Sequence, residues 1–227
     1  MKIGIICAVD TELKPFLSHI QNCKTSKKAM LTIYEGTIGN VEIVTLFCGV
    51  GKTNAAIATQ ILIDTYGANV IINSGTAGGM NTDLDLFDTV ICTEAIHHDV
   101  HEGILTQFQP WMPSASIKAC EILLETSKKA VVKLNRENKV YYGKMVTGEK
   151  FIEDDGREEI MTQYQPLTVD METASIAHVC YVNSIPYIAI RTITDTAKHK
   201  GTDNFEKNCP MASEISKDLV LGLLEEM

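Results

Sequence analysis

The feature that most constrains the fold of this chain is the alternation of short apolar runs with longer segments of helical periodicity. Residues 3–9 are continuously apolar, which is typical of a strand buried on both faces. A helix is then predicted from Asp10, because acids in a first turn interact favourably with the helix dipole. The further predicted strands are 29–37, 41–48, 70–74, 87–93, 140–146, 167–169 and 186–192, and the further predicted helices are 53–65, 114–130, 171–183 and 211–226.

This alternation predicts the fold class. Short strands that alternate with helices favour a mainly parallel sheet with helices on both faces. Segments 29–37 and 41–48 flank Gly39-Asn40 and indicate a hairpin, so the sheet is expected to be mixed. We therefore expect an α/β protein, a three-layer α/β/α sandwich with a central mixed, mainly parallel sheet. The sequence contains no repeat and no linker, so residues 1–227 are predicted to form a single domain.

Composition disfavours several classes of protein. Hydrophobic residues make up 45% and charged residues 22%, the balance of a folded globular protein. The net charge of −9 repels phosphate backbones and anionic lipid, so neither a nucleic acid nor a membrane is expected as a partner. No apolar stretch reaches the ~18 residues that span a bilayer. The seven cysteines are irregularly spaced, which predicts free thiols and a cytoplasmic location.

Two segments resemble ligand-binding motifs without completing one. Residues 49–53 end like a phosphate-binding loop, but Leu46 stands where that loop needs a glycine. We expect a tight strand-to-helix turn there, with the alternative that its backbone amides face a ligand. Residues 97–101 contain three histidines and an aspartate, yet no second His or Cys group has the spacing of a zinc site. A polar loop beside the active site, and no metal, is therefore expected.

Polar side chains follow several predicted strands, at the edge of the sheet where α/β proteins bind ligands. Glu12, Glu172 and Asp195 each follow such a strand, and Arg191 lies in the last one. The glycine-rich segment 73–79 follows another and would let the backbone approach a ligand closely. Each feature alone has a structural alternative, because acids often cap helices and charges at strand ends are often solvated. Together they predict one crevice that contains three acids and an arginine.

With these segments in place, the chain resembles the 5′-methylthioadenosine/S-adenosylhomocysteine nucleosidases of the purine nucleoside phosphorylase superfamily. The matching segments are 1–6, 70–79, 147–152, 171–180 and 191–197. The resemblance implies a single nucleoside phosphorylase-like domain over residues 1–227. It also implies hydrolysis of the N-glycosidic bond of an adenine nucleoside, with water as the nucleophile and no cofactor. The family is typically homodimeric, and a loop of the neighbouring subunit completes the pocket for the 5′ group.

The resemblance also assigns roles to the acids. Glu12 matches the base that activates water, helped by Thr76 and Arg191. Asp195 matches the acid that protonates adenine N7, and Glu172 matches the residue that accepts the 2′- and 3′-hydroxyls of the ribose. The chemistry needs these groups, because adenine leaves poorly as an anion and the sugar passes through an oxocarbenium-like state. Asp195 must therefore stay protonated, which requires a dry site.

Further residues are expected to bind the nucleoside by the same resemblance. Phe151 would stack on adenine, the backbone of Ile152 would read its edge, and Phe205 would cover the sugar and the 5′ group. The remaining expected substrate-binding residues are Thr76, Gly78, Met171, Arg191 and Thr194, with Thr194 supporting the acid.

The chain departs from the family pattern at several positions. Thr76 stands where serine is usual, Val9 replaces a methionine and Asp170 replaces a glutamate. The segment 97–113, which shapes the 5′ pocket, follows the family poorly. The preference among methylthioadenosine, adenosylhomocysteine, 5′-deoxyadenosine and a futalosine-type nucleoside therefore stays open.

Two other functions are alternatives to hydrolysis. A phosphorylase of the same superfamily needs cations beside the sugar to hold phosphate. The chain has three arginines, Arg136, Arg157 and Arg191, and its first strand ends in acids, so phosphorolysis is disfavoured. A nucleoside-binding protein without activity would be expected to lack one of the three acids, and all three are present.

Overall fold

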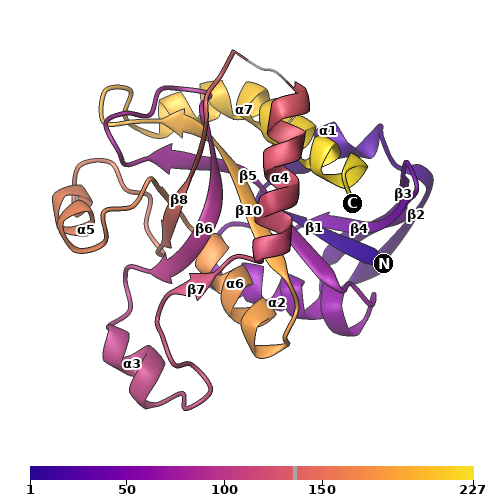
Figure 1. Cartoon of the computed structure of the whole chain (residues 1–227), viewed down its shortest axis with the longest axis horizontal. Helices are drawn as coiled ribbons and strands as arrows, with labels where there is room; N and C mark the ends of the chain where they lie inside the picture. Colours follow the sequence, from indigo (N-terminus) through magenta and orange to yellow (C-terminus); the bar gives the residue numbers. More distant parts are fainter. Residues whose placement is uncertain (135–136) are drawn as a thin grey trace.

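The centre of the molecule is a large mixed β-sheet, seen in the computed structural model that describes residues 1–134 and 137–227 (Figure 1). The strands are β1 (Lys2–Cys7), β2 (Gln21–Lys28), β3 (Leu31–Ile38), β4 (Val41–Phe47), β5 (Val70–Gly79), β6 (Thr89–His97), β7 (Ile117–Lys118), β8 (Val140–Thr147), β9 (Thr168–Asp170) and β10 (Tyr187–Asp195). The helices are α1 (Asp10–Leu17), α2 (Lys52–Asp64), α3 (Glu102–Gln107), α4 (Glu121–Leu134), α5 (Arg157–Tyr164), α6 (Thr173–Val182) and α7 (Thr202–Glu225). Arg136 lies outside the described residues.

The predicted fold class is confirmed, and the sheet has one further property. Parallel ladders join β4 to β1, β1 to β5 and β5 to β10. From β10 the sheet continues through β6, β8 and β9, and β9 then pairs with β5 again. One part of the sheet is thus closed on itself, and this closure brings the ends of β5, β9 and β10 together.

The closure depends on the length of β5. The sequence predicts that this strand ends at Ser74, but it continues to Gly79 because its ladder with β10 continues. Its first half pairs with β1, and its last two residues pair with β9. In the same way β10 continues past the predicted end at Thr192 to Asp195, which lies opposite Gly78. Both predicted ends were therefore too early.

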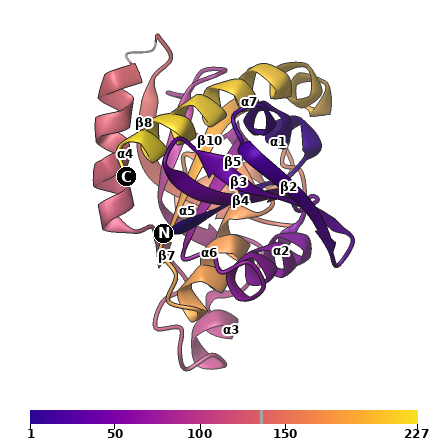
Figure 2. The same cartoon turned by 90° about the vertical axis from the view of Figure 1, so that its right-hand side faces the viewer.

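Helices cover both faces of the sheet, as the three-layer prediction requires (Figure 2). On one face α1, α4 and α7 contribute leucine, valine and phenylalanine side chains to a buried cluster with β1 and β10. On the other face α2 and α6 contribute mostly alanine, isoleucine and leucine to a second cluster. No helix among the described residues is long and apolar enough to cross a membrane.

Several elements differ from the predictions. The helix predicted at 114–130 begins only at Glu121, because β7 precedes it and pairs with β6. The helix predicted at 211–226 begins at Thr202, with Pro210 inside it. Strand β2 was not predicted, because its sequence QNCKTSKK has no apolar alternation and its side chains are largely exposed. The short helices α3 and α5 were not predicted either.

Candidate active site

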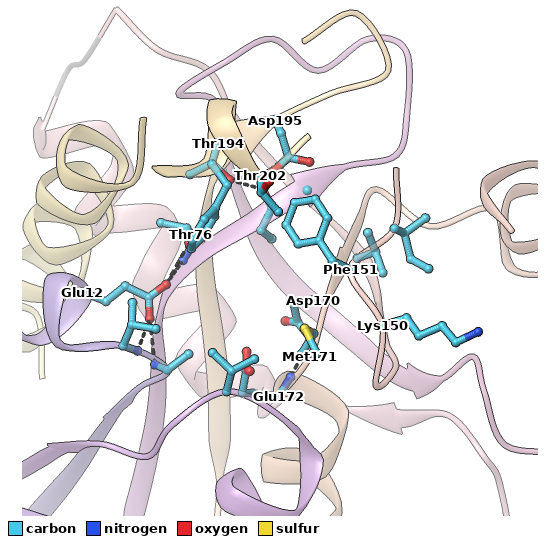
Figure 3. Close-up of a pocket in the computed structure, with 18 of the residues that line it drawn as sticks. Glu12, Thr76, Lys150, Phe151, Asp170, Met171, Glu172, Thr194, Asp195 and Thr202 are labelled. Atoms are coloured by element: carbon cyan, nitrogen blue, oxygen red, sulfur yellow. Dashed lines mark hydrogen bonds between the residues drawn. The ribbon is translucent and has the colours of Figure 1, made fainter. Parts of the chain in front are cut away.

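A pocket of about 240 Å³ lies where the ends of β1, β5, β9 and β10 meet (Figure 3). It contains nearly all of the residues expected to bind substrate or act on it. The predicted residues that line it are Glu12, Thr76, Gly78, Phe151, Ile152, Met171, Glu172, Thr194, Asp195 and Phe205. Arg191 is not among the described residues that line the pocket.

Glu12 occupies one wall of this pocket and is held by four hydrogen bonds. Its Oε2 accepts the backbone amides of Ala8 at 2.7 Å and Val9 at 3.3 Å. Its Oε1 accepts both the amide and the hydroxyl of Thr76, each at 2.8 Å. Glu12 is the third residue of α1, so its contact with Val9 also caps that helix. The side chain is 2% exposed, and all four of these partners donate to it.

Arg191 lies beneath the pocket floor and is fully buried. Its Nη2 is 3.1 Å from Glu172 Oε2, and its Nη1 donates to the carbonyl of Thr76 at 3.2 Å. Nη1 also lies 3.8 Å from Glu12 Oε1. Burial alone would lower the pKa of Arg191, but the surrounding carboxylates outweigh it and hold that pKa above its usual value. Arg191 is thus the countercharge of the buried acids.

Asp170 is a buried acid that the sequence analysis did not place in the site. Its Oδ1 accepts the Thr147 hydroxyl at 2.6 Å and the amides of Glu172 and Thr173 at 3.2 and 3.1 Å. Its Oδ2 contacts the Thr173 hydroxyl and lies 3.3 Å from Arg191 Nε. Asp170 therefore fixes the turn between β9 and α6 that carries Glu172.

Glu172 is held by fewer donors. Gly51 donates its amide to Oε1 at 2.9 Å, and Arg191 binds Oε2. In the turn at 49–53, whose amides were considered as ligand donors, the amide of Gly51 thus binds a carboxylate of the chain. The next amide, of Lys52, binds Glu149 at 3.0 Å. Burial raises the pKa of Glu172 to about 7, with the charge of Arg191 acting against it.

Asp195 forms the opposite wall of the pocket and is 3% exposed. The Thr194 hydroxyl donates to its Oδ1 at 2.8 Å. Burial raises the pKa of Asp195, whereas the hydrogen bond from Thr194 and the charge of Arg157 lower it. A Cβ at Gly78 would lie 3.0 Å from Asp195 Oδ2, so glycine allows this carboxyl to pack against β5.

Aromatic and apolar side chains complete the pocket. The rings of Phe151 and Phe205 meet edge to face, with centroids 6.2 Å apart. Ile152 is buried beside them, and Phe151 is 39% exposed at the mouth. Met171 lies between Phe151 and Glu172 in Figure 3. The arrangement offers a flat apolar slot next to Asp195 and a carboxylate at its other end.

Comparison with known proteins identifies the family. A family model described as the phosphorylase superfamily matches residues 2–225. The 5′-methylthioadenosine/S-adenosylhomocysteine nucleosidase of Anoxybacillus flavithermus is 34% identical over 232 residues, which cover 100% of this chain and 99% of the relative. The chain belongs to this nucleosidase family. It is an enzyme of the N-glycosidic hydrolase class.

Solved structures agree with the fold of this nucleosidase. The 5′-methylthioadenosine/S-adenosylhomocysteine nucleosidase of Colwellia psychrerythraea, in complex with adenine, matches with a TM-score of 0.91 at 29% identity, covering 100% of this chain and 95% of that one. Futalosine hydrolase of Helicobacter pylori also matches with a TM-score of 0.91, at 22% identity, covering 100% of this chain and 98% of that one. The second likeness shows a shared fold alone.

The nucleosidase pocket also contains residues that the sequence analysis missed. Lys150, Thr202 and Glu206 line its mouth. Lys150 precedes the matched Phe151-Ile152 pair, so proximity in sequence was an available signal. Thr202 and Glu206 come from the first turns of α7, which the prediction placed nine residues too late, at Met211. Asp170 was noted as a departure from the family, but its buried contacts with Thr147 and Arg191 are visible only in three dimensions.

The histidine-rich segment of the nucleosidase lies near the pocket without lining it. Asp99 binds Lys52 Nζ at 2.7 Å and the amide of Glu149 at 3.0 Å. These contacts tie the segment to the first residue of α2 and to the strip that leads to Phe151. Burial lowers the pKa of His97 to about 4. Among the described residues, no group of three or more His, Cys, Asp or Glu side chains is arranged to hold a metal ion.

Proposed function

We propose that this nucleosidase hydrolyses the N-glycosidic bond of 5′-methylthioadenosine and/or S-adenosylhomocysteine, releasing adenine and the 5-substituted ribose. The observation that carries the proposal is the pair of carboxyl groups on opposite walls of one pocket. Glu12 is surrounded by donors, and Asp195 is buried with its pKa raised. A hydrolase needs such a pair, one group to activate water and one to protonate the leaving group.

Glu12 is the proposed base. Its Oε1 accepts two short hydrogen bonds from Thr76, whereas its Oε2 accepts one short bond and one of 3.3 Å from Val9. Oε2 is therefore the oxygen with more capacity to bind a further proton donor, and we assign the nucleophilic water to it. The donors hold the carboxylate still, so it is oriented before the water arrives.

Asp195 is the proposed acid. Its Oδ1 accepts the Thr194 hydroxyl, which leaves Oδ2 to carry the proton. Because burial favours the neutral carboxyl, this proton is available to adenine N7 as the glycosidic bond breaks. Phe151 would stack on the base, and the backbone of Ile152 would read its edge.

Glu172 is the proposed ribose ligand, with Met171 beside it. Its carboxylate would accept the 2′- and 3′-hydroxyls and stabilise the positive charge that develops on the sugar. Arg191 reaches Glu172 from below and is 0% exposed, so we propose that it positions Glu172 and Glu12 without touching the substrate.

The cations near the pocket support water over phosphate as the nucleophile. Among the described lining residues Lys150 is the one cationic side chain. Arg191 is committed to Glu172, and Arg157 donates to the carbonyl of Gly79 at 2.8 Å. A bound phosphate would therefore face the Glu12 carboxylate with little compensation.

The test is to measure kcat/KM for a panel of 5′-substituted adenosines, with and without phosphate, by following adenine release. The panel contains methylthioadenosine, adenosylhomocysteine, 5′-deoxyadenosine and futalosine. We expect rates that do not depend on phosphate and are highest for the first two nucleosides. Strict dependence on phosphate would establish a phosphorylase instead, and cleavage of futalosine alone would refute the proposed substrates.

Two other predictions remain with this proposal. The chain is expected to act as a homodimer in which a loop of the neighbouring subunit completes the pocket for the 5′ group. Residues 1–227 are expected to form a single domain. Light scattering and a single cooperative unfolding transition would test them.

A further inference from the structure

Arg157 is a cation that the proposed chemistry does not use. It is the first residue of α5 and follows Gly156, which has a left-handed backbone with φ of 80°. Its guanidinium reaches back to the end of β5, where Nη1 and Nη2 both donate to the Gly79 carbonyl, at 3.0 and 2.8 Å. Its Nε donates to the carbonyl of Glu153 at 3.2 Å. One side chain thus ties the strip that carries Phe151 to the sheet.

The point to which Arg157 is tied lies next to the proposed acid. Gly78 is the register partner of Asp195, and a Cβ at Gly78 would lie 3.0 Å from Asp195 Oδ2. A Cβ at Gly79 would lie 3.4 Å from the Asp195 carbonyl oxygen. Arg157 therefore binds the short piece of β5 against which Asp195 packs.

The charges around Asp195 give this placement a chemical consequence. Burial raises the pKa of Asp195, the Thr194 hydrogen bond and the Arg157 charge lower it, and Glu153 raises it. The other charged side chains that line the same pocket are Glu12, Lys150, Asp170, Glu172 and Glu206. Asp154, near Arg157, is paired with Lys200 at 2.5 Å.

We propose that Arg157 is a positioning residue of this active site, which fixes the adenine-binding strip 150–156 on β5 and places a positive charge beside Asp195. The inference rests on the proposed role of Asp195 as the acid. A general acid works best when it neither loses its proton before the substrate arrives nor holds it too tightly. The charge of Arg157 lowers the pKa of Asp195 against the effect of burial, which keeps the acid able to give its proton.

Four variants separate the two parts of the proposal. Arg157→Gln removes both the charge and the guanidinium fork, whereas Arg157→Lys keeps the charge and cannot bridge to Gly79 in the same way. Glu153→Gln removes an exposed acid whose effect on Asp195 has the opposite sign. Lys128→Gln removes an equal charge on α4, where Lys128 pairs with Glu125 at the surface, and serves as the control.

The first measurement is the titration of the Asp195 carboxyl carbon by NMR, identified by its loss in Asp195→Asn. We expect the midpoint of this titration to move to higher pH in Arg157→Gln and to lower pH in Glu153→Gln. In Lys128→Gln the midpoint should not change. The second measurement is the pH profile of kcat/KM. The pH at which its alkaline limb falls should shift in the same direction as the Asp195 titration in each variant. In Arg157→Lys, KM should rise by on the order of tenfold, the effect of one lost charged hydrogen bond.

An unmoved Asp195 titration in both Arg157→Gln and Glu153→Gln would overturn the electrostatic part, and an unchanged KM in Arg157→Lys would overturn the anchoring part. Because Glu153 is exposed, its variant keeps the test valid even where Arg157→Gln folds poorly. The NMR titration does not depend on turnover, so failure of this inference is distinct from failure of the proposed function, which would appear as a wild-type protein that releases no adenine.

Discussion

The two walls of the pocket hold their carboxyl groups in opposite ways (Figure 3). On one wall Glu12 accepts four hydrogen bonds, three of them from backbone amides. On the other wall, within residues 1–134 and 137–227, Asp195 accepts one side-chain hydrogen bond, from Thr194. Both side chains are almost fully buried, at 2% and 3% exposure, so burial alone does not distinguish them.

The difference lies in the number of donors, and it assigns the proposed roles. Hydrogen bonds to a carboxylate favour its ionised form, whereas burial without them favours the neutral form. A carboxylate surrounded by amides suits a base, and a carboxyl with a raised pKa suits an acid. If this contrast holds, replacing each carboxyl by its amide should affect the two walls differently.

Glu12→Gln should lower both activity and stability. Loss of the proposed base should reduce kcat by roughly 10²–10⁴-fold. The amide nitrogen of glutamine would also face backbone donors, either those of Ala8 and Val9 or that of Thr76, and leave at least one buried donor unpaired. That should cost about 1–3 kcal/mol of unfolding free energy. Single-turnover rates and urea unfolding measure the two effects, and an unchanged stability would show that the four donors do not require a carboxylate.

Asp195→Asn should lower activity without lowering stability. Loss of the proposed acid should reduce kcat by roughly 10²–10⁴-fold. Because an amide resembles a protonated carboxyl and still accepts the Thr194 hydroxyl, the unfolding free energy should change by less than about 0.5 kcal/mol. Nucleoside Kd, measured by calorimetry, should change by less than about tenfold. Undiminished adenine release would refute the assigned role, and a loss of stability as large as that of Glu12→Gln would erase the contrast between the walls.

Much of this arrangement was predictable from the sequence. The apolar run at 3–9 and the acid that follows it predicted both β1 and the placement of Glu12 at its end. The same reasoning placed Asp195 beside Glu12, because the ends of the parallel strands β1, β5 and β10 meet at one edge. Glu172 was predicted in the same crevice, but it follows β9, which runs antiparallel to β5, so its place there depends on the closure of the sheet.

The donors that distinguish the acids were not predictable in this way. Gly51 and Glu172 are 121 positions apart, and Thr76 and Glu12 are 64 positions apart, so no local pattern announces either bond. The closure of the sheet depends on a ladder that runs through glycines, which a propensity argument interprets as a turn. Asp170 stayed outside the predicted site for the same reason, since its partners Thr147 and Arg191 come from other strands.

The dependence of stability on pH tests the contrast at Glu172. Burial raises the pKa of this residue in the folded protein to about 7, above its ordinary value of 4.5. At pH values between these two pKa values the folded state binds more protons than the unfolded state, so Glu172 makes the unfolding free energy fall as pH rises. Above about pH 7 the full destabilising cost of the ionised Glu172 is present. That cost is roughly 3 kcal/mol from the value of 1.36 kcal/mol per unit.

Glu172→Gln should therefore gain stability relative to the wild-type protein between pH 5 and 8, as measured by urea unfolding at each pH. The difference between the two proteins isolates this residue from the histidines, whose lowered pKa values act in the opposite direction. A difference that does not change with pH would mean that Arg191 holds Glu172 ionised throughout this pH range.

The two glycines beside the acids provide the smallest and most local comparison. A Cβ at Gly75 would lie 2.5 Å from Glu12 Oε1 and 2.7 Å from Arg191 Nη1, so Gly75→Ala must displace a carboxylate that four donors hold in place. A Cβ at Gly78 would lie 3.0 Å from Asp195 Oδ2, a carboxyl that can rotate away at the loss of its bond to Thr194. We expect Gly75→Ala to cost about 1–3 kcal/mol of unfolding free energy and Gly78→Ala less than about 1 kcal/mol, the range of strain that overpacking produces. Urea unfolding of the two variants measures this difference, and equal losses would mean that Asp195 is held as rigidly as Glu12 by packing alone.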